Sequence, residues 1–167
     1  MQTLISFATE LNALAERVAG SLRWFAPLLA RLTVGLVFVG SGWGKLHNLE
    51  QVTQFFTELG LPAPGFQAIL ASTTELVCGL LVLVGLATRF ASLPLIVVMM
   101  VAIRTALWDQ VTGLSSLVGL LEFSYIALLV SLAVYGGGAV SLDGLLAMLF
   151  ARRESAAPRG ATMMKLA

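Results

Sequence analysis

The sequence predicts an all-α membrane protein, a four-transmembrane-helix bundle with short interfacial helices. Two observations predict this fold class. Of the 167 residues, 58% are hydrophobic and 11% are charged, whereas a soluble domain averages about 45–50% apolar and about 25% charged residues. Four apolar windows also supply roughly the 20 residues that a helix needs to cross a bilayer. Because unsatisfied backbone groups cannot face lipid, such windows are expected to be helical.

The predicted spans are residues 25–46, 66–87, 90–108 and 117–135. Only Thr88 and Arg89 join the second span to the third, which predicts a tight antiparallel pair. This transmembrane domain, residues 25–135, follows an N-terminal cytoplasmic-side amphipathic segment, residues 1–24. It precedes a C-terminal interfacial helix and flexible tail, residues 136–167.

Three segments outside the spans carry apolar residues at helical spacing, which predicts helices lying in the membrane interface. Their apolar positions are Leu4, Phe7, Leu11, Leu14, Val18 and Leu22 in the first, Leu49, Val52, Phe56 and Leu59 in the second, and Leu142, Leu145, Leu146 and Leu149 in the third. Their main partner is expected to be membrane lipid. A packing or anchoring role is favoured over a binding role.

The distribution of lysine and arginine predicts the orientation, because cytoplasmic loops carry the excess of these residues. One side of the predicted bundle collects Arg17, Arg23, Arg89, Arg152, Arg153, Arg159 and Lys165. Both termini are therefore expected in the cytoplasm. Residues 1–16 contain Glu10 and Glu16 and no basic residue, so we expect no cleavable signal peptide.

The composition excludes several classes of function. A net charge of +1 gives no general attraction to nucleic acid. The single cysteine, Cys78, excludes an intrachain disulfide and a CxxC redox pair, and the single histidine, His47, excludes bis-histidine haem ligation within one chain. We therefore expect no metal site and no covalently bound cofactor, and redox chemistry would need a quinone, a partner protein or a site shared between chains.

Ionisable residues within spans cost about 2.5–3.5 kcal/mol each on insertion scales and usually face the bundle interior. Arg31, Glu75, Arg104 and Glu122 lie inside the predicted spans, and Lys45 lies at the rim. Two interpretations stay open. In the first, Arg31 and Glu75, which are separated by roughly 8–9 Å along the membrane normal, form a structural intramembrane pair. In the second, the charged residues line a polar ligand-binding pocket that opens toward the outer face. The candidate pocket residues are Glu75, Arg104, Glu122, Tyr125 and Lys45.

An ordered series of motifs covers roughly residues 27–147. It comprises Arg31-x3-Gly35-x2-Phe38-x3-Gly42-x2-Lys45, then Glu75-x3-Gly79-x3-Leu83-x-Gly85-Leu86-x-Thr88-Arg89, then Tyr135-Gly136 and Ser141-Leu142-Asp143. The glycines beside the charges are expected to let the first two spans approach closely. The series resembles the DoxX family of small bacterial membrane proteins. The family-like positions are Arg31, Gly42, Lys45, Glu75, Gly79 and Arg89, whereas Arg104 and Glu122 lie outside the pattern.

The resemblance implies a bacterial inner-membrane location and an association with redox chemistry, since the name-giving relatives are subunits of a thiosulfate:quinone oxidoreductase. Two functions are weighed. The first is a redox-associated subunit that acts with a partner protein and a quinone. The alternative is a non-enzymatic membrane anchor or accessory protein, for example in metal or stress handling, with a small-solute carrier ranked below both. The chain supplies no complete catalytic constellation, so a partner protein or a homo-oligomer is expected.

Overall fold

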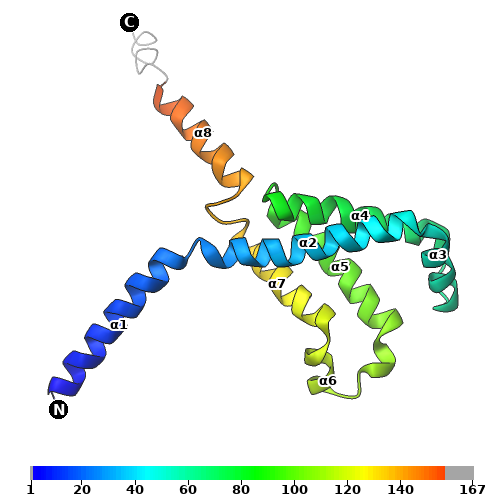
Figure 1. The fold of residues 1–167 in the computed structure, drawn as a ribbon, viewed down its shortest axis with the longest axis horizontal. Helices are drawn as coiled ribbons and strands as arrows, with labels where there is room; N and C mark the ends of the chain where they lie inside the picture. Colours follow the sequence, from blue (N-terminus) through cyan, green and yellow to red (C-terminus); the bar gives the residue numbers. More distant parts are fainter. Residues whose placement is uncertain (1, 157–167) are drawn as a thin grey trace, which may run out of the picture.

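The computed structural model describes residues 2–156, and every regular element within that range is helical. Figure 1 shows the arrangement of these elements. In chain order they are α1 Gln2–Leu22, α2 Phe25–His47, α3 Leu49–Glu58, α4 Pro64–Val84, α5 Thr88–Ala106, the 3-10 turn η1 Trp108–Gln110, α6 Leu114–Gly119, α7 Leu121–Tyr135 and α8 Leu142–Ala156. Most of the predicted flexible tail lies outside the described residues.

Three of the described helices, α2, α4 and α5, are long and apolar enough to cross a membrane. They match the first three predicted spans to within three residues at either end. The connection between α4 and α5 differs from the prediction, because Thr88 and Arg89 already belong to α5. The turn is made instead by residues 85–87, where Gly85 (φ 75°) and Ala87 (φ 48°) are left-handed.

The fourth predicted span, residues 117–135, is not one continuous helix. Its first part belongs to α6, which ends at Gly119, and Leu120 is extended before α7 begins. Glycine is the weakest helix former after proline, which favours a break at this point. The 15 residues of α7 extend about 22 Å, less than the hydrocarbon thickness of about 30 Å. The four-span topology therefore stays a prediction.

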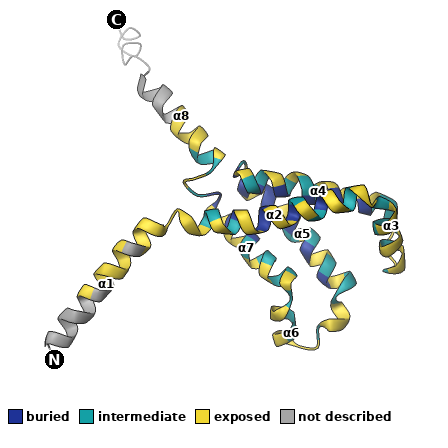
Figure 2. Ribbon diagram, in the orientation of Figure 1, coloured by how far each residue is buried: buried dark blue, intermediate teal, exposed yellow. Residues whose placement is uncertain are grey.

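The core lies where α2 packs on α4 and α5 packs on α7 (Figure 2). Glycines allow the first of these contacts, as predicted. A Cβ on Gly42 would contact the backbone of Leu76 and lie 2.8 Å from the Ser72 carbonyl oxygen, and a Cβ on Gly79 would lie 2.8 Å from Phe38 Cβ. Within the described chain, the completely or almost completely buried apolar residues are Val34, Phe38, Ala68, Val82, Leu95, Leu129 and Leu132.

The segments predicted to be interfacial are helical, as α1, α3 and α8. Their placement against a membrane is not part of the structure and stays a prediction. In Figure 1, α1 and α8 point away from the bundle, whereas α3 packs against the N-terminal part of α4. Of these three helices, α3 makes the most extensive contact with the bundle.

Candidate functional site

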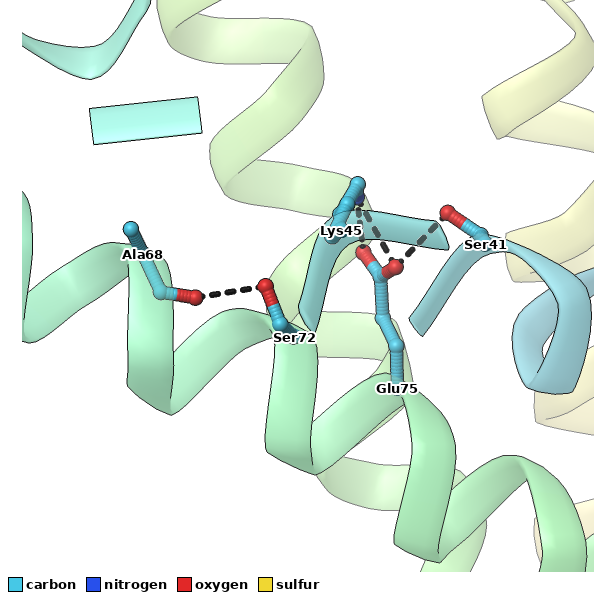
Figure 3. Close-up of polar contacts among 5 residues, drawn as sticks. All are labelled: Ser41, Lys45, Ala68, Ser72 and Glu75. Atoms are coloured by element: carbon cyan, nitrogen blue, oxygen red, sulfur yellow. Dashed lines mark hydrogen bonds and ion pairs between the residues drawn. The ribbon is translucent and has the colours of Figure 1, made fainter. Parts of the chain in front are cut away.

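The best-defined polar cluster inside the bundle joins α2 to α4 (Figure 3). Lys45 Nζ lies 2.6 Å from Glu75 Oε1 and 2.8 Å from Oε2. Ser41 Oγ donates to Glu75 Oε2 at 2.8 Å. Ser41 and Lys45 are one helical turn apart and share a face of α2. Gly42, on the same helix, brings the backbone of α4 close enough for both side chains to reach the carboxylate.

The two charges of this ion pair differ in burial. The Glu75 side chain is 1% exposed, and the Lys45 side chain is 34% exposed. The carboxylate accepts two bonds from Lys45 and one from Ser41, so its charge is compensated within the bundle. An ammonium group has three N–H donors, of which Glu75 takes two. One N–H of Lys45 is therefore available to a ligand.

Lys45 and Glu75 lie in the wall of a cleft of about 740 Å³ between α3, α4 and α5. Figure 1 shows α4 and α5 separating from their connecting turn, and α3 lies near the other end of α4. Pockets for organic ligands have volumes of about 300–1,000 Å³, mostly apolar walls and a few polar groups. The cleft fits this description. Its apolar wall includes Val52, Phe55, Phe56, Leu70, Val97 and Val101.

The predicted Arg31–Glu75 pair is not formed, because Glu75 pairs with Lys45. Arg31, which is 3% exposed, donates from Nη1 to the Gly137 carbonyl oxygen at 2.9 Å. The register of α2 against α4 explains this. Ser41 lies beside Glu75, and Arg31 is ten residues from Ser41, or about 15 Å along the helix. A side chain cannot cover that distance.

The predicted five-residue pocket is brought together only in part, because only Lys45 and Glu75 line the cleft. The Arg104 guanidinium lies 4.8 Å from the centre of the Trp108 ring and is exposed. Tyr125 packs its ring 6.0 Å from that of Phe38. Glu122 is partly buried in the first turn of α7.

Sequence reasoning missed Ser41, although its spacing from Lys45 was a usable signal. It also missed a junction at the opposite end of α4. There the Asp143 carboxylate accepts from the backbone N–H of Ala87 (2.9 Å) and Thr88 (3.3 Å), and the Asp143 N–H donates to the Gly85 carbonyl (3.0 Å). Asp143 thus caps the N-terminus of α5 from a distant part of the chain.

The comparisons with known proteins give one family model and several similar bacterial proteins. The DoxX family model matches residues 26–108. A Bacillus subtilis protein named "Putative oxidoreductase CatD" is 36% identical over 118 residues, covering 70% of this chain and 83% of that protein. "Inner membrane protein YphA" of Escherichia coli is 31% identical over 143 residues, covering 80% and 99%. "Inner membrane protein YqjF" of the same organism is 29% identical over 119 residues, covering 71% and 90%. No solved structure matches the chain.

Proposed function

This chain belongs to the DoxX family of membrane proteins, and on that premise we propose that it is a redox-associated inner-membrane subunit that binds a quinone. The single observation that carries the proposal is the Lys45–Glu75 pair in the wall of the apolar cleft. The name of the Bacillus subtilis relative describes an oxidoreductase, and those of the Escherichia coli relatives describe inner membrane proteins.

A quinone combines an apolar ring with carbonyl oxygens that accept hydrogen bonds. The free N–H of Lys45 supplies a charge-assisted donor for one carbonyl. Glu75 holds the ammonium group in position through both carboxylate oxygens. The ring then rests against the apolar residues of α4 and α5.

Electron transfer in this proposal needs a second protein. The chain has one histidine and one cysteine, so a haem or cluster ligated by these residues requires another chain. We infer that a partner supplies the redox centre and that this subunit positions the quinone. On the predicted four-span topology, with α7 as the fourth span and both termini cytoplasmic, the cleft would lie in the outer half of the bilayer.

The alternative, a non-enzymatic anchor or accessory protein, is favoured by a different observation. α1 points away from the bundle in Figure 1, and its apolar residues recur at helical spacing. A helix of this kind suits binding to a membrane surface or to a partner. On this alternative, the cleft would hold lipid and show no preference for a quinone.

The test is the thermal stability of the purified protein with and without a short-chain quinone. A ligand that binds only the folded state at a hundred times its dissociation constant stabilises it by about 2.7 kcal/mol. We expect wild type and Arg104→Gln to be stabilised, since Arg104 lies outside the cleft. Lys45→Gln should lose the effect.

A second variant guards against loss of folding in Lys45→Gln. Val101 lines the cleft and is 43% exposed, so Val101→Phe should fill the cleft without touching the ion pair. It should abolish stabilisation by the quinone while keeping the unliganded melting temperature close to that of wild type. Stabilisation of neither wild type nor Arg104→Gln would contradict the proposal and favour the accessory role.

A further inference from the structure

Thr74 differs from Thr105, the other hydroxyl residue in the wall of the cleft. Hydroxyl groups within helices commonly donate to the carbonyl one turn earlier. Ser72 Oγ donates to Ala68 O at 2.6 Å, Ser92 Oγ to Thr88 O at 2.8 Å, and Thr105 Oγ1 to Val101 O at 2.8 Å. The Thr74 hydroxyl has no partner within residues 2–156.

The position of Thr74 connects this free hydroxyl with the cleft. Thr74 lines the cleft together with Gln67, Leu70 and Ala71, which precede it at helical spacing on the same face of α4. Glu75 is the next residue along the chain. Within the described chain, two side-chain atoms are both completely enclosed and without a hydrogen-bond partner, Arg31 Nε and Thr88 Oγ1. The Thr74 oxygen also has no partner but is not one of these two, so it is not completely enclosed. The Thr74 hydroxyl is therefore accessible from the cleft.

The other polar groups of the cleft are less suited to contact a ligand. Thr105 is already bonded to its own helix. The Gln67 amide donates to the Pro62 carbonyl oxygen at 2.6 Å. Gln51 is exposed on α3. Gln67 keeps its second N–H, but it lies eight residues before Glu75, about 12 Å along α4. Lys45 and Thr74, on two different helices, are therefore the donors in the wall of the cleft that lie beside Glu75.

We propose that Thr74 is a specificity-determining residue, whose hydroxyl donates to a second oxygen of the ligand held by Lys45. This inference rests on the proposed function and narrows its ligand class to ring compounds that carry two acceptor oxygens. A dione satisfies both donors at once. A compound with one carbonyl leaves one of them without a partner in an apolar surrounding, which weakens its binding.

The test compares Thr74→Val, Thr74→Ser and the matched control Thr73→Val, all in the purified full chain in nanodiscs; Thr73 is exposed on the same helix and lies outside the cleft. The probes are a short-chain benzoquinone and its cyclohexenone counterpart with one carbonyl. Thr74→Val should bind the quinone about tenfold more weakly, as expected for the loss of one hydrogen bond. Thr74→Ser should retain most of the wild-type affinity, and Thr73→Val should bind like wild type.

The one-carbonyl probe adds a measurement that a merely structural role would not change. It should bind wild type and Thr74→Val with equal, weak affinity. Equal quinone affinities of wild type and Thr74→Val would overturn the role of Thr74 and leave the proposed function standing. Equal losses in Thr74→Val and Thr73→Val would do the same. No quinone binding by wild type would overturn both proposals.

Discussion

Removing either member of the Lys45–Glu75 pair should destabilise the bundle, and the two losses should be unequal. Lys45→Met leaves a carboxylate that is 1% exposed with Ser41 as its remaining donor. Breaking a buried pair in this way typically costs about 3–5 kcal/mol. Glu75→Gln leaves a lysine whose side chain is 34% exposed, two residues before the end of α2. This lysine can extend toward the interface, and the glutamine keeps an acceptor for Ser41.

We therefore expect Glu75→Gln to cost about 1–3 kcal/mol, the range for an impaired buried hydrogen bond. The assay is reversible unfolding in mixed micelles, followed by tryptophan fluorescence. The double variant Lys45→Met/Glu75→Gln should lose less unfolding free energy than the two single variants together, with a coupling energy of about 0.5–3 kcal/mol. Glu75 without Lys45 is the costly state, and the double variant avoids it.

Arg31 provides the matched control. It donates to Gly137 and lies about ten residues along α2 from the cluster, so Arg31→Gln and Glu75→Gln should be additive to within about 0.5 kcal/mol. A larger loss for Glu75→Gln than for Lys45→Met would refute the reasoning from burial. Strong coupling of Glu75 to Arg31 with none to Lys45 would refute the ion pair itself.

Three further outcomes are expected. Gly42→Ala should cost about 1–3 kcal/mol of unfolding free energy, because its Cβ would meet the α4 backbone. Gly44→Ala should be near neutral, because no other atom lies within 4 Å of the position of its Cβ. Equal effects of the two substitutions would contradict the packing of α2 on α4. Asp143→Ala should cost about 0.5–2 kcal/mol through loss of the α5 cap, and Asp109→Ala, in the exposed η1 turn, should change stability little in the same assay. Reporter fusions after Ala167 and within residues 48–65 should report opposite compartments, and matching signals would exclude the four-span topology.

Much of the fold could be predicted from the sequence, because the length of an apolar run and its flanking residues act locally. The bounds of α2, α4 and α5 and the helical character of α1, α3 and α8 followed from such patterns. The break at Leu120 did not, since Leu117–Tyr135 is apolar enough to appear continuous. A glycine at position 119 was the available sign that the helix could end there.

The candidate site was less predictable, because it depends on how helices are placed against one another. Depths counted separately along each span put Arg31 within reach of Glu75. The contact of Gly42 and Gly79 across α2 and α4 fixes a different register and selects Lys45. The cleft likewise depends on the divergence of α4 from α5, which the apolar pattern of neither helix records; Pro94, inside α5 and in the wall of the cleft, was the available sign of an irregularity there.

The central claim, that a quinone binds beside Lys45 and Glu75, is tested most directly by photoaffinity labelling. The probe is a short-chain quinone with a photoreactive group, applied to the full chain in nanodiscs and mapped by peptide sequencing. Labels on the cleft segments of α3, α4 and α5 that disappear in Val101→Phe and on addition of unlabelled quinone are the predicted result. Labels around Glu122 and Tyr125, or labelling unaffected by competition and by Val101→Phe, would contradict the claim.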